Sequence, residues 1–461
     1  MDALFNPVSV ALIGASAHPN KIGNVMLKNL AKGGFRLFPV NPKESEILGL
    51  RCYASICDLP KPVDLAVITL PAEAAAAAAK ECAAAGVRIV VLTASGFRES
   101  GPKGMTLENE LRDSFQRSGT RLLGPNTMGV FVPRNKLDTF LISEGRSRRP
   151  SAGKIAMVSQ SGAVSIAFLE KAEAAGVGIS ACVGIGNKLD LDEVDMLDFF
   201  GNDPETECIA FYLESFADGR LFVDKARRVS RSKPIVVLKA GRTASGSRAA
   251  GSHTGAIASS SDALIDGALK QAGVLRVYDE EELLDVAKAL SAVGSIRGDR
   301  ICVAASAGGF GVIAADFIED RDHGFGLKLA KLAERTRQAL REVVPSFSSV
   351  DNPIDLTAGV TDDMYDAVLG ILQSDPNTDG IMMSLELQPP GVTDELVEIA
   401  SRRARAGTPI IVSAFAADQA ALLKSLQMRS VVAYPTIKRA IRALAALSQR
   451  GTYLDSMEKR G

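Results

Sequence analysis

Tryptophan is missing from this 461-residue chain, and aromatic residues make up only 5% of it. Single-stranded nucleic acids are usually held by stacking on aromatic side chains, so such a partner is not expected. Net charge is almost absent too, because 53 Lys and Arg residues face 54 Asp and Glu residues and leave a formal charge of −1. Nucleic-acid binders and polybasic membrane binders need a strong positive patch. We therefore predict no nucleic-acid partner and no membrane partner.

Metal-ligand patterns are scarce as well. The chain has three histidines and six cysteines, and no two cysteines form a C-x-x-C pair, so no metal site is predicted. Cysteines in a chain this rich in aliphatic residues are typical of buried thiols in a reducing compartment. No apolar run reaches the roughly 18 residues of a membrane span, and no signal-peptide pattern opens the sequence. We expect a cytoplasmic protein.

The sequence does contain short apolar runs that alternate with helical patterns, which is typical of βαβ units and parallel sheets. A prior of roughly 150 residues per domain gives about three domains, and three successive α/β units are predicted, at residues 1–139, 150–293 and 298–461. A polar, Arg-rich stretch near 140–153 is predicted to be a linker, and a helix over 280–292 to close the second unit.

The first unit has the strand pattern of a Rossmann-like domain. Its five predicted strands cover residues 8–13, 36–40, 64–70, 88–93 and 121–123. In the second unit the predicted strands include 154–158 and 208–213. Because ligands of parallel sheets collect at the carboxyl ends of the strands, the residues that end each strand are the candidates for a binding site.

The first strand ends at Gly14-Ala15-Ser16 and is followed by Lys21-Ile22-Gly23. Such a glycine turn is either an ordinary packing turn or a helix start that holds a phosphate with its N–H groups. Later strands end near Lys43, Pro71 and Ser95. Together with Ser16, these residues favour a nucleotide-type ligand at this edge.

A dinucleotide such as NAD is disfavoured there. The first turn is not G-x-G-x-x-G, and Asn41-Pro42-Lys43 stands at the end of the second strand, where a dinucleotide fold places an acidic ribose ligand. An NAD-dependent dehydrogenase is therefore a poor hypothesis, and a ligand whose phosphates reach Lys43 is a better one.

Two other glycine-containing turns connect a strand to a helix. Ser159-Gln160-Ser161-Gly162 does so in the second unit, and Ala307-Gly308-Gly309-Phe310-Gly311 in the third. Each can bind an anion, because unpaired N–H groups and the helix dipole point out of a helix N-terminus. A single turn of this kind is more often a packing turn, whereas two of them beside one nucleophile would be specific.

The nucleophile candidate is His253, within AGSHTGA in a small, polar segment (243–261) that we expect to be a mobile surface loop. An isolated loop histidine is usually only solvated, but here flanking glycines allow close backbone approach and small neighbours leave room for a bulky group. Neutral imidazole attacks phosphoryl groups when an acceptor orients its other nitrogen. Glu214, at the end of a predicted strand, is that acceptor or else a helix-capping or solvated carboxylate.

Together these motifs resemble the NDP-forming acyl-CoA synthetases, relatives of succinyl-CoA synthetase, and more narrowly the α subunits of ADP-forming acetyl-CoA synthetases. The resemblance rests on VALIGAS with KIG, PVNPK, GPN, VSQSGAV, FYLES, GSHTGA, and SAGGFGV followed by DNPIDL, and it covers nearly the whole chain. It implies an α/β fold in which a Rossmann-like CoA-binding domain precedes two flavodoxin-like, succinyl-CoA synthetase-like domains.

The resemblance also implies roles for single residues. His253 matches the histidine phosphorylated during turnover, and Glu214 the glutamate that steadies it. Residues at phosphate-binding helix N-termini are matched by Ser159, Gln160, Ser161, Gly162, Gly308, Gly309 and Gly311. Residues that line CoA are matched by Gly14, Ala15, Ser16, Lys43, Pro71, Thr93 and Ser95. The family sequence Asn-Pro-x-Asp is present as Asn352, Pro353 and Asp355, with no role assigned.

The implied reaction converts acyl-CoA, phosphate and ADP reversibly into carboxylic acid, CoA and ATP, through an acyl phosphate and a phosphohistidine. Two departures from the family stand out. Thr127-Met128 follow GPN where many relatives have Cys-Leu, which implies a different acyl pocket, and the sequence does not specify the acyl group. The chain also lacks the ATP-grasp domains that hold ADP or ATP with Mg.

We therefore expect an ATP-grasp β subunit and an assembly that is a dimer or a hetero-tetramer. The alternative hypothesis is a non-catalytic CoA-binding or regulatory homologue without its own nucleotide site. A pure binding protein would need neither His253 nor Glu214 nor the two later glycine turns, so the enzyme is favoured.

Overall fold

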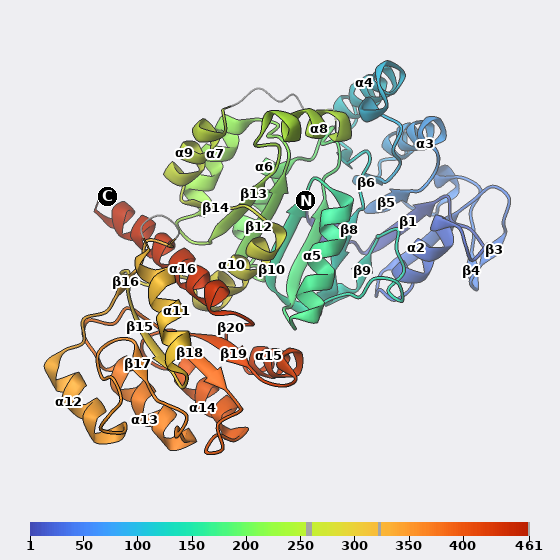
Figure 1. The fold of residues 1–461 in the computed structure, drawn as a ribbon. Helices are drawn as coiled ribbons and strands as arrows, with labels where there is room; N and C mark the ends of the chain where they lie inside the picture. The colour runs from blue at the N-terminus through green and yellow to red at the C-terminus, as the bar shows by residue number, and fades with distance from the viewer. Residues whose placement is uncertain (255–260, 321–323, 460–461) are drawn as a thin grey trace. The chain divides into compact units, whose positions relative to one another are not determined.

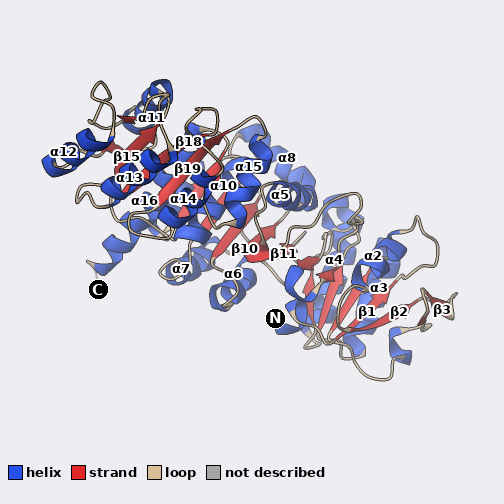
Figure 2. Ribbon diagram, turned by 90° about the horizontal axis from the view of Figure 1, so that it is seen from below, coloured by secondary structure: helices blue, strands red, loops and turns tan. Residues whose placement is uncertain are grey.

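The computed structural model describes residues 1–254, 261–320 and 324–459, apart from the side chains of residues 252–254. The chain forms two compact units, the first comprising Met1–Glu173 and Gly178–Leu283 and the second Ala174–Val177 and Leu284–Gly461. Both contain parallel sheets with helices packed on them (Figures 1 and 2). This confirms the predicted α/β fold class.

The first sheet is parallel throughout and has the order β2-β1-β5-β6-β7. Its strands are β1 (Ser9–Ile13), β2 (Arg36–Val40), β5 (Leu65–Ile68), β6 (Ile89–Leu92) and β7 (Arg121–Leu123). Around them lie α1 (Asp2–Phe5), α2 (Ile22–Leu30), η1 (Ile56–Asp58), α3 (Ala72–Ala84), η2 (Arg98–Ser100) and α4 (Pro102–Gln116), with the small hairpin β3 (Glu46–Ile47) and β4 (Leu50–Arg51). The strands β1, β5 and β6 are buried along their whole length, as expected when both faces of a parallel sheet are covered.

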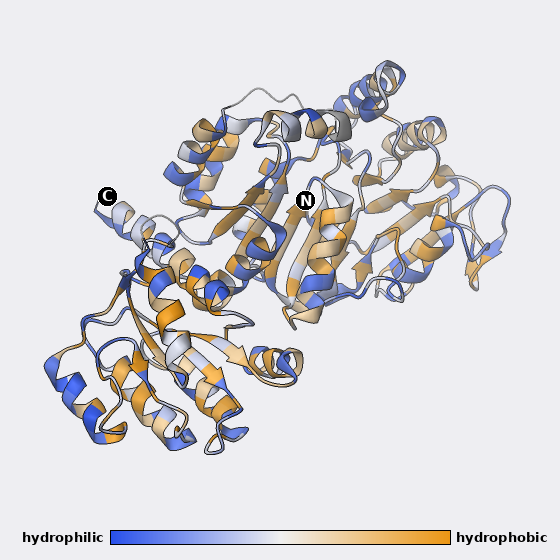
Figure 3. Ribbon diagram, viewed as in Figure 1, coloured by the Kyte–Doolittle hydropathy of each residue, from blue (hydrophilic) through white to orange (hydrophobic). Residues whose placement is uncertain are grey.

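The second sheet has the order β14-β13-β12-β10-β11-β8-β9. Its parallel strands are β10 (Ala152–Ser159), β11 (Ile179–Gly184), β12 (Cys208–Leu213), β13 (Ile235–Lys239) and β14 (Val274–Val277). The accompanying helices are α5 (Gly162–Ala174), α6 (Glu193–Asn202), α7 (Gly219–Val229), α8 (Ala244–Thr254) and α9 (Asp262–Gln271). In Figure 3 the strands of both sheets are largely orange, so the apolar core lies along them.

Several short strands were not predicted, and two of them extend the second sheet beyond β11. β8 (Val130–Val132) pairs antiparallel with β11, and β9 (Leu137–Asp138) pairs with β8, with η3 (Pro133–Asn135) between them. Residues 130–138 therefore extend the second sheet, although they fall inside the predicted first domain. The bounds 1–139, 150–293 and 298–461 stay a prediction.

The second compact unit contains a sheet of order β16-β15-β18-β19-β20, with β17 beside β15. The strands are β15 (Arg300–Ala305), β16 (Lys328–Leu329), β17 (Ile354–Asp355), β18 (Gly380–Glu386), β19 (Ile410–Phe415) and β20 (Ala433–Tyr434). The helices are α11 (Gly308–Glu319), α12 (Glu334–Val343), α13 (Asp362–Gln373), α14 (Glu395–Ala404), α15 (Gln419–Met428) and α16 (Ile437–Glu458). In the described part of the chain, every helix is too short or too polar to cross a bilayer.

The helix expected over 280–292 is present as α10 (Glu280–Val293). From Leu284 onward it belongs to the second compact unit. There Arg439 Nε donates to the Asp285 carboxylate at 2.6 Å and the Tyr434 hydroxyl donates to the Asp285 carbonyl at 2.7 Å. These polar contacts bind α10 to β20 and α16. The helical spacing of its apolar residues alone does not reveal them.

Candidate functional site

The predicted CoA residues follow strands that end level with one another. Ile13 is in register with Val40 and with Ile68, and Ile68 is in register with Leu92. The residues immediately after these strands therefore lie side by side at the carboxyl edge of the first sheet, which we call the first edge. All seven predicted CoA residues come from the segments that follow these strands.

Two glycines bring the helix after β1 against its turn. Gly14 has φ +92°, which L side chains rarely adopt. A Cβ on Gly23 would lie 2.0 Å from the Gly14 carbonyl oxygen, so the first turn of α2 sits directly on the backbone of this turn. Any side chain at position 23 would push the helix away from the first edge.

The seven predicted CoA residues divide into two groups. Lys43, Pro71 and Ser95 are exposed and Gly14 is half-buried, so these four are accessible to a ligand. Ala15, Ser16 and Thr93 are buried and hold the edge together. The Ala15 carbonyl accepts from Asn41 Nδ2 at 2.8 Å, Ser16 Oγ from the His18 amide at 3.1 Å, and Thr93 Oγ1 donates to the Ile68 carbonyl at 2.9 Å.

The turn Ser159–Gly162 lies at the carboxyl end of β10 and opens α5. Ser159 Oγ donates to the Ser161 carbonyl at 2.7 Å and accepts from the Ser161 amide at 3.1 Å, which fixes the turn. Gln160 Oε1 accepts from the main-chain amides of Glu214, at 2.9 Å, and Ser215, at 3.2 Å. The turn and Glu214, chosen separately from the sequence, are thus joined by direct hydrogen bonds.

Glu214 is 7% exposed at the end of β12. Lys239 Nζ, at the end of β13, donates to its carbonyl at 2.7 Å, and the Tyr212 hydroxyl donates to its Oε1 at 3.4 Å. Burial, together with the Glu214 charge, raises the pKa of Tyr212 to about 12, so the phenol keeps its proton at neutral pH. Burial, with the nearby Arg276 charge, lowers the pKa of Lys239.

His253 falls in the last turn of α8, and its side chain, like residues 255–260, lies outside the described residues. The expected surface loop over 243–261 is therefore wrong for residues 244–254, which form a helix. Thr243 Oγ1 accepts from the Gly246 amide at 3.1 Å, as an N-cap does. α8 packs against η2, which follows Ser95 at the first edge, and this contact supports a helix that its small, polar residues do not favour.

The third glycine turn lies in the second compact unit, at the start of α11. A Cβ on Gly308 would lie 2.8 Å from Asp355 Oδ2, and one on Gly311 would lie 3.2 Å from Pro353 Cβ. Asn352 is anchored to β15, since its Oδ1 accepts from the Val303 amide at 2.9 Å. The Asn-Pro-x-Asp sequence therefore packs against this turn. Binding of one phosphate by Gly308, Gly309 and Gly311 together with the Ser159–Gly162 turn stays a prediction.

A buried polar network that the sequence analysis missed joins the first edge to Glu214. Asn187 Nδ2 donates to Glu99 Oε2 at 2.6 Å and to Glu108 Oε2 at 3.1 Å. Lys188 Nζ donates to Glu193 Oε2 at 2.9 Å and to the carbonyl of Ser215, the neighbour of Glu214, at 2.8 Å. Both residues follow β11, so the rule that strand ends carry sites would have found them.

Glu99 keeps its charge in this network. Burial acts to raise the pKa of its carboxyl group, but hydrogen bonds from the Asn187 side chain and from the amides of Gly96 and Phe97 outweigh it and lower the pKa. The carboxylate thereby fixes the turn after Ser95, at the first edge.

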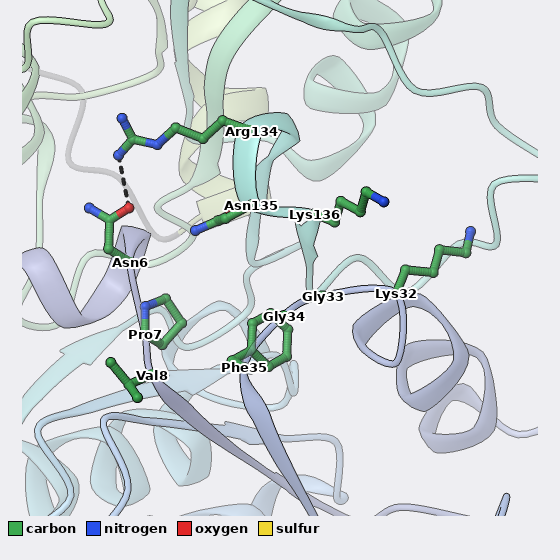
Figure 4. A pocket seen from close by; sticks show the side chains of 10 residues that line it. All are labelled: Asn6, Pro7, Val8, Lys32, Gly33, Gly34, Phe35, Arg134, Asn135 and Lys136. Atoms are coloured by element: carbon green, nitrogen blue, oxygen red, sulfur yellow. Dashed lines mark hydrogen bonds between the residues drawn. The ribbon is translucent and has the colours of Figure 1, made fainter.

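The opposite, amino edge of the first sheet carries a cavity of about 640 Å³ (Figure 4). It lies next to the starts of β1 and β2, and Arg134 donates to Asn6 Oδ1 there at 2.9 Å. Its lining residues are Asn6, Pro7, Val8, Lys32, Gly33, Gly34, Phe35, Arg134, Asn135 and Lys136, and none of them is a predicted site residue. Among the described residues, no three His, Cys, Asp or Glu side chains are grouped to hold a metal ion.

Comparisons with known proteins identify the families to which the parts of the chain belong. Residues 8–133 match the family described as CoA binding domain, residues 152–290 the succinyl-CoA ligase like flavodoxin domain, and residues 301–451 the Ligase-CoA domain. The α subunit of acetate–CoA ligase [ADP-forming] I from Pyrococcus furiosus is 38% identical over 97% of this chain and 97% of its own length. The chain belongs to the family of ADP-forming CoA ligases.

Two further relatives extend the comparison. The 4-hydroxybutyrate–CoA ligase [ADP-forming] from Nitrosopumilus maritimus is 32% identical over 98% of this chain, which spans 64% of that relative's length. The structure of Ca. Korarchaeum cryptofilum dinucleotide forming acetyl-coenzyme A synthetase 1 in complex with phosphate and ADP is 36% identical, with a TM-score of 0.91 over 100% of this chain and 98% of that chain. The predicted family, fold and enzyme class, an acid–thiol ligase, are confirmed.

Proposed function

We propose that this chain is the catalytic α-type subunit of an ADP-forming acyl-CoA synthetase, which interconverts acyl-CoA, phosphate and ADP with carboxylic acid, CoA and ATP. One observation carries the proposal. Gln160 of the phosphate-type turn binds the main chain of buried Glu214, and the helix that contains His253 packs against η2 beside the predicted CoA edge. These residues lie in the first compact unit, whereas the third glycine turn lies in the second.

The first half-reaction takes place between CoA at the first edge and phosphate at the Ser159–Gly162 turn. The exposed Lys43 and the glycine turn at Gly14 suit the phosphates of CoA, because a cation and a helix N-terminus both favour anions. A phosphate held at the N-terminus of α5 attacks the thioester carbonyl carbon through one oxygen. The C–S bond breaks, the sulfur leaves with the electron pair and takes up a proton, and an acyl phosphate remains.

In the second half-reaction, a neutral nitrogen of His253 attacks phosphorus. The bond between phosphorus and the carboxylate oxygen breaks, and the carboxylate leaves with the electron pair. Glu214 accepts the hydrogen bond of the other ring nitrogen and stabilises the phosphorylated imidazolium. Gln160 and Lys239 support this role, because they bind main-chain groups of Glu214 and so fix the position of the residue.

ADP and ATP, with Mg, are proposed to bind an ATP-grasp β subunit that takes the phosphoryl group from His253. The name of one relative supports this assignment, because the Pyrococcus furiosus protein that is 38% identical to this chain is itself a subunit alpha. We expect a dimer or a hetero-tetramer. The six free cysteines, five of them buried, favour the reducing cytoplasm.

The test is phosphorylation of the chain by acetyl-CoA and [32P]phosphate. We expect acid-labile, base-stable label on the wild-type chain and on His323→Ala, and none on His253→Ala. Equal labelling of His253→Ala would refute the assignment of the nucleophile. CoA binding without labelling by any acyl-CoA would favour the non-catalytic, regulatory homologue instead.

A further inference from the structure

The loop Gly124–Gly129 connects the first edge to the phosphate-type turn. At its start, the Asn126 amide donates to the Ala94 carbonyl at 2.8 Å, beside Ser95. At its end, Thr127 Oγ1 donates to the Gly184 carbonyl, and the Gly129 amide donates to Thr127 Oγ1 at 2.9 Å. The loop thus begins where CoA is proposed to bind and ends beside β10 and β11, where phosphate is proposed to bind.

Met128 is the side chain that this loop places on the phosphate-type turn. A Cβ on Gly162 would lie 2.3 Å from Met128 Cγ and 3.1 Å from its Sδ, so the thioether lies directly against the first residue of α5. The neighbours Thr127 and Gly129 are buried, whereas Met128 is half-buried and presents apolar surface on the accessible side of the turn.

The thioester carbonyl carbon has to lie between the CoA sulfur and the attacking phosphate. If CoA is held at the first edge and phosphate at the N-terminus of α5, the acyl group attached to that carbon extends into the space bounded by the loop 124–129. Met128 is the large apolar side chain that the loop brings to the α5 end of this space. A flexible thioether can adjust its conformation to fill such a space, but contact with Gly162 prevents Met128 from moving toward α5.

We propose that Met128 forms the wall of the acyl pocket at the N-terminus of α5, so that the size of the side chain at position 128 decides which acyl groups fit. This inference rests on the proposed function. It goes further, since it names the residue that selects among acyl substrates.

The experiment compares rates of His253 labelling by [32P]phosphate with acetyl-CoA, butyryl-CoA and phenylacetyl-CoA, each in wild type, Met128→Ala and Met128→Phe. Removing the thioether should raise the phenylacetyl-to-acetyl rate ratio about 10-fold or more, because a few methylene groups in an apolar pocket discriminate by roughly 10–200-fold. Met128→Phe should lower the ratio for butyryl-CoA against acetyl-CoA. Using a ratio cancels any general loss of active protein.

Met105→Ala is the matched control, because Met105 is 53% exposed on α4, away from the loop 124–129; it should leave both ratios unchanged. Unchanged ratios in both Met128 variants, with wild-type labelling intact, overturn the inference and leave the proposed function standing. Failure of every acyl-CoA to label the wild-type chain removes the proposed function and this inference with it.

Discussion

At the scale of single residues, the predicted site is held by side chains that bind main-chain groups. Gln160 and Lys239 fix the backbone of Glu214, and Glu99 fixes the turn after Ser95. The Glu214 carboxylate, the proposed partner of His253, is therefore positioned by an amide and an ammonium group that bind its main chain. Substitutions of the neighbours and of Glu214 itself should have separable effects, on geometry and on chemistry respectively.

Replacing the Glu214 carboxylate with an amide tests its chemical role. We expect Glu214→Gln to slow labelling of His253 by about 10²–10⁴-fold, the usual contribution of a positioned acid–base or orienting group. The urea midpoint should stay near that of wild type, since the main-chain contacts of residue 214 remain. Rapid quench with [32P]phosphate measures the rate. Glu205→Gln, at an exposed position, is the control; equal rates in the two variants would contradict the role of Glu214.

Lys288 gives a prediction for stability against pH. It is fully buried in the second compact unit, with Nζ 4.3 Å from the centre of the Tyr434 ring, and burial lowers its pKa from 10.5 to about 8. Between those two pH values the unfolded chain binds a proton at this lysine that the folded chain does not. The contribution of Lys288 to the free energy of unfolding therefore rises with pH between about 8 and 10.5, and it is constant below about pH 8, where both states are protonated.

The measurement is the difference in unfolding free energy between wild type and Lys288→Met, from urea titrations followed by circular dichroism. It should shift in favour of wild type by about 1 kcal/mol per pH unit between pH 8 and 10. Other groups titrate alike in both proteins, so the difference isolates Lys288. A difference that stays constant over this range would show that Lys288 is not shifted.

At the scale of helices and strands, the sequence predicted the buried parallel strands. It missed elements such as β8 and α8, which depend on pairing or packing with distant segments. The strand expected at 208–213 is β12 with those bounds, because a buried parallel strand is a continuous apolar run. The strand expected at 36–40 is β2, which also has the predicted bounds although it lies at the sheet edge with Arg36 exposed. β8 is only three residues long and exists through its pairing with β11. α8 consists of small and polar residues; its cap at Thr243 is local, but its contact with η2 depends on the tertiary fold.

The same limit applies to the site. The strand-end rule found Glu214 and the Ser159–Gly162 turn, since β10 and β12 are adjacent in the sheet. It did not indicate that Gln160 binds Glu214, because a loop's side-chain directions are not encoded in any period of the sequence. Nor did it reveal Met128 against Gly162, a contact between segments 34 positions apart.

Helix α2 offers a prediction at this scale. In Gly23→Ala the added methyl group would lie 2.0 Å from the Gly14 carbonyl oxygen, so the helix must move off the β1 turn. We expect a loss of about 1–3 kcal/mol in unfolding free energy, as for other overpacked sites, and weaker CoA binding by calorimetry. Gly34→Ala is the matched control, because a Cβ there would meet open space. Equal stability and CoA affinity in both variants would contradict the tight packing of α2.

At the scale of the whole molecule, the proposed function divides the reaction between this chain and a partner. The predicted CoA edge, Glu214 and the backbone of His253 belong to the first compact unit, and the third glycine turn to the second. The proposed nucleotide site belongs to a partner. An intermediate held covalently on this chain makes such a division workable, because the acyl and nucleotide substrates then need not meet.

A labelling stoichiometry tests this division. Acetyl-CoA and [32P]phosphate should load about one phosphoryl group per chain and then stop, because one histidine carries it and nothing discharges it. Mg-ADP alone should leave the label in place, whereas Mg-ADP with a candidate ATP-grasp β subunit should move it to ATP, detected by chromatography. Mg-ADP with a heat-denatured β subunit is the control. Discharge by Mg-ADP alone would mean that this chain binds the nucleotide itself, and the proposed partnership would then be wrong.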